Sequence, residues 1–257
     1  ITGFCVNLYI WDTDEVWNFQ FIYKMLNIYK IYTDANVITT PLFHSIGYIL
    51  LKILGQNILV FRIYNILIMT IMYFLIYKIL GKLSKNKFSI FVYFFIIMIE
   101  TIMLCAGGAN YNALAINFVL LGVYFNLKWI EEEKQHNVKQ GIIMFLVLFT
   151  KQNIGVFYIF GVCLYQLIKE RNIKNIIKQI VTLGILVGIS MIIFIHFGIF
   201  NDFINYAVLG IGEFAKENIG GSINNLIKML CFAIFVSILT AFLIKKKIIQ
   251  NEDKNKL

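Results

Sequence analysis

The amino-acid sequence predicts an all-α, polytopic helical membrane protein. Of its 257 residues, 60% are hydrophobic and only 14% are charged, and the mean hydropathy is +0.77. A soluble domain usually carries about 25% charged residues. A chain of this size has too little interior to bury so much apolar surface. The apolar residues also gather in runs near the roughly 20 residues that a helix needs to cross a bilayer.

The formal net charge of +9 does not indicate a nucleic-acid-binding protein. The lysines fall in short runs between apolar stretches, as expected for membrane loops. The four cysteines are isolated: Cys5, Cys105, Cys163 and Cys231. Without paired spacing, and with three scattered histidines, the sequence predicts neither a metal site nor a disulfide framework.

Each apolar stretch is expected to form one membrane helix. The candidate spans are 58–80, 88–106, 111–130, 176–198 and 224–244. The segment 140–168 is interrupted by "TKQN" (150–153), so we expect a helical hairpin of two short arms. Residues 1–10 lack an initial methionine and a basic region, which indicates the tail of a truncated helix in a fragment.

Lysine-rich loops orient the predicted spans. We expect the cytoplasmic loops to be 78–87, 128–139, 169–178 and 245–247. The opposite, outer face then holds 11–57, 107–110, 150–153 and 199–223. Residues 1–257 are expected to form a single transmembrane domain, in which six to eight helices or half-helices follow an outer loop at 11–57.

The outer loop contains two amphipathic stretches. In the first, apolar side chains recur at helical spacing, as in a helix lying in the membrane interface: Val16, Phe19, Tyr23, Leu26 and Tyr29. The second stretch, 42–54, follows Pro41, which suits a first helical turn, and ends at Gly55.

Several short motifs follow one another in a recognisable order. They are "DE" (14–15), "YTD" (32–34), "TPLFHSIGYILLKILG" (40–55), "FRIYNILIMTIMYFLIYKIL" (61–80) and "LFTKQNIG" (148–155). This order resembles the N-terminal part of the GT-C superfamily of membrane glycosyltransferases, and within it the dolichyl-phosphate-mannose protein mannosyltransferase-like family (glycosyltransferase family 39 and bacterial relatives). The chain departs from the family pattern at Thr40, where the family has a proline.

The resemblance implies a multi-pass enzyme of the cell membrane whose active face is extracytoplasmic. Such an enzyme moves a sugar from a polyprenyl-phosphate carrier to a glycan, lipid or protein acceptor. The resemblance implies no certain cofactor, and whether the enzyme binds a divalent cation stays open.

The acidic residues of the outer loop carry the implied catalytic chemistry. Asp14 is the candidate general base for the acceptor hydroxyl. Its neighbour Glu15 would orient a partner, and Asp34 would bind the acceptor or, together with Asp14, a divalent cation. The alternative for each is an acid in a solvated loop.

Two basic residues are the candidates for binding the donor phosphate. Lys151 lies at the break between two apolar arms, where a lysine is costly unless it pairs or faces water. Arg62 is the second candidate. The alternative to phosphate binding is that Lys151 snorkels to the membrane interface and that Arg62 anchors its helix. Gln152 and Asn153 are expected to add hydrogen bonds.

Four further residues are candidates for lining the sugar pocket: Tyr32, His44, Asn110 and Tyr111. An interfacial histidine is more often structural, and the glycine-rich "GGANYN" (107–112) also suits a tight turn that caps the next helix.

Two other classes of protein remain open. A transporter or flippase of lipid-linked sugars should place its charges near the bilayer midplane on broken helices in repeated halves. This sequence has one broken segment, no repeat and its acids in the outer loop, which favours the enzyme. A non-catalytic membrane subunit would share all of these features.

Overall fold

The computed structural model describes residues 13–27, 30–105, 109–131, 136–169 and 173–210. The chain divides into two compact units, residues 1–208 and 209–257, and the description below concerns the first. The predicted truncated helix at 1–10 and the predicted span at 224–244 lie outside the described residues.

The described part of the chain is helical, as the sequence predicts. Its elements are α2 (Thr13–Leu26), α3 (Leu42–Leu54), α4 (Ile58–Leu83), α5 (Lys87–Cys105), α6 (Tyr111–Glu131), α7 (Asn137–Thr150), α8 (Gln152–Lys169), α9 (Ile173–His196), α10 (Phe200–Phe203) and the π-helix η1 (Ile204–Leu209). One isolated bridge, between Ile31 and Ala35, lies outside them.

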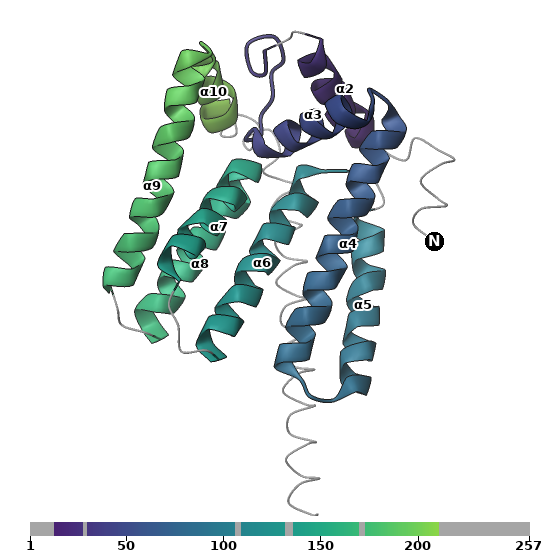
Figure 1. Cartoon of the computed structure of the whole chain (residues 1–257), viewed down its shortest axis with the longest axis vertical. Helices are drawn as coiled ribbons and strands as arrows, with labels where there is room; N and C mark the ends of the chain where they lie inside the picture. The colour runs from purple at the N-terminus through teal and green to yellow at the C-terminus, as the bar shows by residue number, and fades with distance from the viewer. Residues whose placement is uncertain (1–12, 28–29, 106–108, 132–135, 170–172, 211–257) are drawn as a thin grey trace, which may run out of the picture. The chain divides into compact units, whose positions relative to one another are not determined.

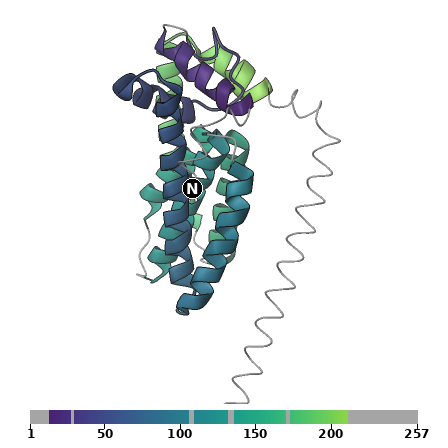
Figure 2. The ribbon, with the colours of Figure 1, turned by 90° about the vertical axis from the view of Figure 1, so that its right-hand side faces the viewer.

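Helices α4 to α9 run alternately up and down in a bundle, and α7 packs against α6, α8 and α9 (Figure 1). Helices α2 and α3 lie at the end of the bundle where α4 begins (Figure 2). We call this the α2 end, and the other the lysine-loop end. The helix directions put the connections predicted as outer at the α2 end and those predicted as cytoplasmic at the other, within the described residues.

Three of the described helices are long and apolar enough to cross a membrane: Ile58–Leu83, Tyr111–Ile130 and Ile173–His196. They correspond to predicted spans 58–80, 111–130 and 176–198. The fourth predicted span, 88–106, forms α5, whose described apolar part, Lys87–Ile99, is shorter.

The break at 150–153 separates two antiparallel helices, which confirms the predicted hairpin (Figure 1). Helix α7 has 14 residues and is therefore about 21 Å long, less than the roughly 30 Å hydrocarbon core. Lys151 leaves the helix with φ −153° and ψ 109°. Gly155 permits the tight return, because a Cβ there would collide with the backbone of Leu148.

Helices α2 and α3 pack on the start of α4 through a buried apolar cluster. Its large members include Ile22, Phe43, Leu51, Phe61 and Tyr64. Helix α3 has the predicted bounds and follows Pro41, and Gly55 ends it with φ +110°.

Of the apolar stripe predicted for α2, Phe19 and Leu26 pack against this cluster, but the fully buried positions of the helix are others. Glu15, Asn18 and Ile22 are its buried residues, whereas Tyr23 is 43% exposed. Hydrophobic spacing alone could not orient the helix, because Glu15 has a cationic partner on α4 that makes its burial favourable.

Candidate functional site at the α2 end

Asp14, Tyr111 and Lys151 come together from three separate segments. Asp14 lies in the first turn of α2, where an acidic side chain complements the helix dipole. Tyr111 begins α6 and Lys151 lies in the break between α7 and α8. The Nζ atom of Lys151 lies 4.1 Å from the centroid of the Tyr111 ring. The Asp14 carboxylate acts electrostatically on both side chains.

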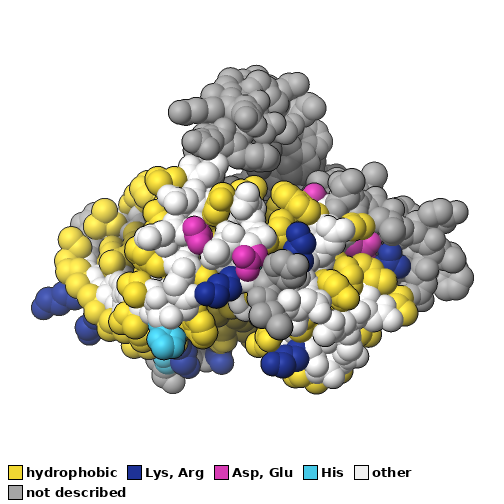
Figure 3. Space-filling view, turned by 90° about the horizontal axis from the view of Figure 1, so that it is seen from above, with side chains coloured by type: hydrophobic (Ala, Val, Ile, Leu, Met, Phe, Trp, Pro, Cys, Tyr) yellow, Lys and Arg dark blue, Asp and Glu magenta, His cyan; other side chains and the backbone are white. Residues whose placement is uncertain are grey.

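The environment of Lys151 lowers the affinity of its side chain for a proton. Partial burial lowers the pKa of Lys151 to about 8, and the attraction of the Asp14 carboxylate only partly opposes that change. The ammonium group is thus poorly hydrated and gains from an anionic partner. The ring of Tyr111 adds a cation–π contact on one side. Figure 3 looks onto this end and shows acidic and basic side chains near one another among apolar ones.

A buried ion pair holds the start of α2 against α4. The Nε atom of Arg62 donates to Oε1 of Glu15 at 2.8 Å, and its Nη2 atom donates to Oε2 at 3.2 Å. The Glu15 side chain is 3% exposed and that of Arg62 is 9% exposed. Two parallel charge-assisted hydrogen bonds restrict orientation as well as distance. They therefore restrain the helix turn that carries Asp14.

His44 lies in the aromatic packing beside this site. Its imidazole is buried and makes edge contacts with Phe21 and Phe43. Within the described residues neither of its ring nitrogens has a hydrogen-bond partner. Burial lowers the pKa of His44 to about 4, so the ring is neutral at pH 7. The ring of Phe43 also contacts Tyr111, with 6.1 Å between centroids.

Asp34 and Tyr32 stabilise the loop between α2 and α3. The backbone N–H of Lys30 donates to Oδ2 of Asp34 at 2.6 Å. The hydroxyl of Tyr32, which has φ +75°, donates to the carbonyl of Thr39 at 2.8 Å. Roles in binding an acceptor, sugar or cation stay predictions for both residues. Among the described residues, no group of three or more His, Cys, Asp or Glu side chains is arranged to hold a metal ion.

The remaining predicted pocket residues make backbone contacts. Oδ1 of Asn110 accepts from the N–H of Ala113 at 2.8 Å and so caps α6, the alternative that the sequence left open. Nε2 of Gln152 donates to the carbonyls of Ile38 and Ala207, at 2.8 and 2.9 Å. Oδ1 of Asn153 accepts from the next backbone N–H at 2.9 Å. Their direct roles toward a substrate stay predictions.

Sequence reasoning named Glu15 and Arg62 separately and missed that they pair. A usable signal existed, since an arginine on an apolar helix requires a counter-charge. It also missed Thr40, whose Oγ1 donates to the carbonyl of Leu148 at 3.0 Å. This bond ties the start of α3 to α7, which carries Lys151 at its end.

The fold and this site define a helical membrane protein with acidic and basic side chains gathered at one end. Residues 39–195 match the family model described as "Dolichyl-phosphate-mannose-protein mannosyltransferase". The match covers more than half of the chain, so the chain belongs to this family, which indicates a membrane glycosyltransferase. No curated protein and no solved structure matches the chain.

The matched segment contains part of the candidate site. Arg62, Tyr111 and Lys151 fall inside residues 39–195, whereas Asp14 and Glu15 precede them. The family assignment therefore rests on α3 and the bundle. The roles of the two acidic residues rest on their position beside it.

Proposed function

We propose that this protein transfers a sugar from a polyprenyl-phosphate carrier to an acceptor hydroxyl at the α2 end of the bundle. The observation that carries this proposal is the convergence of Asp14, Lys151 and Tyr111 from three segments. The transfer requires a carboxylate and a poorly hydrated ammonium close enough to influence each other electrostatically, as Asp14 and Lys151 do. Membership in the family supports a lipid-linked donor.

In the proposed step, the acceptor oxygen attacks the anomeric carbon of the sugar. Asp14 accepts the proton of that hydroxyl as the new C–O bond forms. The bond between the anomeric carbon and the phosphate oxygen breaks, and its electron pair leaves with the polyprenyl phosphate. The Lys151 ammonium stabilises the added negative charge. A positioned base of this kind typically contributes 10²–10⁴-fold in rate.

The Glu15–Arg62 ion pair acts as a positioning element. It fixes the first turn of α2 on α4, and Asp14 is the residue next to Glu15 in that turn. With its guanidinium engaged by Glu15, Arg62 supports the site through α2. Contact between Arg62 and the donor phosphate is not needed in this mechanism.

The reaction is assigned to the extracytoplasmic face. Among the described residues, the lysine-rich helix ends near 78–87, 128–131, 136–139 and 173–178 lie at the opposite end of the bundle, and the positive-inside rule favours a cytoplasmic position for such segments. A lipid carrier explains how a sugar reaches the outer face, where nucleotide sugars are absent.

The proposal is tested with membranes from cells that express this protein. They are supplied with a panel of radiolabelled polyprenyl-phosphate sugars, and release of label from the carrier is followed. Wild type is compared with Asp14→Asn at equal protein level. The matched control is Asp202→Asn: Asp202 accepts a hydrogen bond from Thr33 at 2.8 Å, which an asparagine oxygen can still accept.

We expect release by the wild type and by Asp202→Asn, and a loss of about 10²–10⁴-fold in Asp14→Asn. Equal release by all three proteins would remove Asp14 from the role of base. No release with any carrier sugar would contradict the transfer reaction and favour a transporter or a non-catalytic subunit.

A further inference from the structure

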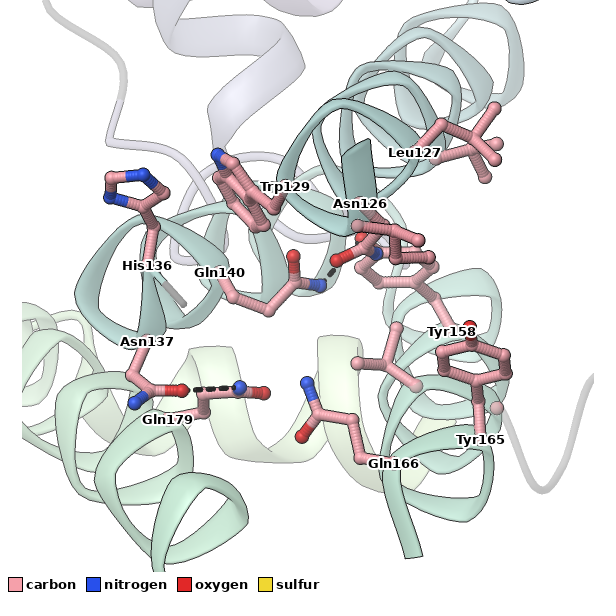
Figure 4. A pocket seen from close by; sticks show the side chains of 14 residues that line it. Asn126, Leu127, Trp129, His136, Asn137, Gln140, Tyr158, Tyr165, Gln166 and Gln179 are labelled. Carbon is pink, nitrogen blue, oxygen red and sulfur yellow. Dashed lines mark hydrogen bonds between the residues drawn. The ribbon is translucent and has the colours of Figure 1, made fainter. Parts of the chain in front are cut away.

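A cavity of about 570 Å³ lies far from Asp14, between α6, α7, α8 and α9 (Figure 4). Its lining comes from the halves of these helices near the lysine-loop end. Most of the lining is apolar, but three glutamines enter it, one from each of α7, α8 and α9: Gln140, Gln166 and Gln179. The three glutamines lie within the family match at 39–195, but none of the motifs that carry the resemblance contains them and the proposed reaction does not use them.

Each of the three glutamines buries an amide oxygen that has no hydrogen-bond partner within the described part of the chain. Gln140 is 1% exposed, Gln166 is 6% exposed and Gln179 is 2% exposed. Buried side-chain oxygens of this kind are normally paired with protein or with another molecule. Three in one cavity indicate a missing hydrogen-bond donor.

Two of the amides are held in fixed orientations. Nε2 of Gln140 donates to the hydroxyl of Tyr158 at 2.9 Å, and Nε2 of Gln179 donates to Oδ1 of Asn137 at 2.9 Å (Figure 4). Because their nitrogens are used in these bonds, their oxygens stay available as acceptors. Gln166 points into the same space from α8 (Figure 4).

The cavity also offers aromatic surface. Trp129, Tyr158 and Tyr165 line it, and Trp129 is supported by a stacked contact with Phe125, 5.5 Å between centroids. Gly122 makes room for Tyr158, because a Cβ at that position would collide with the tyrosine hydroxyl. Aromatic faces suit the C–H faces of a sugar ring or an apolar chain that leads from a headgroup.

Apart from His136, the lining residues have apolar or uncharged polar side chains, and no lysine, arginine, aspartate or glutamate is among them. A bare phosphate or a carboxylate would find no lysine or arginine among the residues that line the cavity. An isolated ammonium would lack a counter-ion, which is costly in an apolar protein. Neutral amide acceptors and aromatic rings select a neutral ligand that is rich in hydroxyl groups.

We propose that this cavity binds a neutral polyhydroxyl group, a sugar or glycerol, whose hydroxyls donate to the oxygens of Gln140, Gln166 and Gln179. The same chemistry is available from a lipid headgroup, entering between the helices, or from a free sugar. The site is separate from the one proposed for sugar transfer, and its occupancy does not require that reaction.

Trp129 provides a direct reporter of binding. The sequence has three tryptophans, so Trp11→Phe with Trp17→Phe leaves Trp129 alone. The full chain is placed in phosphatidylcholine nanodiscs that contain a glucosyl diacylglycerol brominated high in its acyl chain. Brominated phosphatidylcholine in parallel discs measures quenching by lipid in general. Methyl glucoside and glycerol are then added as free competitors.

Gln166→Leu is the test variant, because it removes an unpartnered oxygen and keeps a similar side-chain volume. Gln20→Leu, the same change at an exposed position of α2, is the matched control. We expect the glucosyl lipid to quench Trp129 more strongly than brominated phosphatidylcholine. Gln166→Leu should weaken that preference about tenfold, the loss expected for one buried hydrogen bond, and Gln20→Leu should leave it unchanged.

The competitors separate the two sources. Reversal of the quenching by methyl glucoside supports recognition of the sugar alone, while quenching that no free sugar reverses supports a lipid headgroup. A change in Trp129 emission with methyl glucoside but not with the lipid supports a free sugar. Equal quenching by both lipids, no response to free sugar and greater thermal stability of Gln166→Leu would overturn the proposal, because the cavity would then hold only water or acyl chains.

Discussion

The two ends of the bundle solve the problem of burying polar groups in different ways. At the α2 end, ionised side chains lie beside opposite charges or an aromatic ring, as in Glu15 with Arg62 and Lys151 over Tyr111. At the lysine-loop end, three buried glutamine oxygens line a cavity and have no hydrogen-bond partner among the residues that the structure describes. Burying an unpaired charge costs much more free energy than burying an amide oxygen that lacks a hydrogen bond. The first end therefore suits an anionic donor and the second a neutral hydroxyl group.

The same helices serve both ends. Helix α6 begins at Tyr111 and carries Trp129 near its other end, and α8 follows Lys151 and carries Gln166 near its other end. Because the two sites lie at opposite ends of these helices, a substitution at one end should leave binding or transfer at the other unchanged, provided that the bundle stays folded. The following changes test that separation.

The largest effect is expected from breaking the buried ion pair. Glu15→Ala leaves the buried Arg62 guanidinium without its carboxylate, which should lower the free energy of unfolding by about 3–5 kcal/mol. Thermal unfolding of the purified protein measures the loss. Sugar transfer should fall as well, since the turn that carries Asp14 is no longer held.

The double variant Glu15→Leu with Arg62→Met is the control for this change. Replacing both partners by apolar side chains removes both buried charges, so most of the stability should return. If the double variant is as unstable as Glu15→Ala, the packing of these side chains matters more than their charges.

The next effect concerns the cation at the break between α7 and α8. Lys151→Met removes the proposed phosphate contact and should lower kcat/KM for the polyprenyl-phosphate sugar about 10- to 100-fold, the usual value of a hydrogen bond to a charged group. Lys151→Arg, which keeps the charge, should lose less. An unchanged kcat/KM in Lys151→Met would show that Lys151 is a structural residue at the turn.

A smaller effect is expected from a methyl group at the amide cavity. Gly122→Ala should displace the Tyr158 hydroxyl that holds Gln140, and should lower the free energy of unfolding by about 1–3 kcal/mol. Gly184→Ala is the matched control, since a Cβ there meets nothing within 4 Å. Sugar transfer per folded molecule should be unchanged in both. A loss of transfer in folded Gly122→Ala would show that the two ends are coupled.

The smallest effect concerns pH. Because the pKa of Lys151 is about 8 and that of an ordinary lysine is near 10.5, donor affinity should fall as pH rises through about 8. Between about pH 8 and 10.5, Lys151 is mostly protonated in the unfolded chain and mostly deprotonated in the folded one. The contribution of this lysine to the free energy of unfolding therefore increases as pH rises through that range. A pH profile of kcat/KM measures the first effect. Lys151→Arg should lack the fall near pH 8, and the same fall in both proteins would assign it to another group.

Much of the fold follows from local sequence signals. Pro41 and Gly55 set the bounds of α3, and the polar "TKQN" marks the break that separates α7 from α8. Long apolar runs predict α4, α6 and α9 because membrane crossing needs length and composition, both visible in one segment.

The site was predictable only in part. Asp14 could be named from the family resemblance and Lys151 from its position at the helix break. The cation–π contact of Lys151 with Tyr111, and the electrostatic effect of Asp14 on both, depend on how three helices pack. The burial of Glu15 was not predicted, because it depends on the ion pair with Arg62, which lies on a different helix. Single glutamines on apolar helices give no local signal, so the amide cavity emerges only when α7, α8 and α9 are brought together.

The most direct test of the central claim, that sugar transfer takes place at the α2 end, is photochemical labelling by the donor. A polyprenyl-phosphate sugar that carries a photoreactive group next to its phosphate is irradiated with the full protein in nanodiscs, and the labelled peptides are identified by mass spectrometry. We predict label in the peptides that contain Tyr111 and Lys151, and its loss with excess unlabelled donor. Competed label confined to the peptides that contain Gln140 and Gln166 would place the donor at the opposite end and contradict the account.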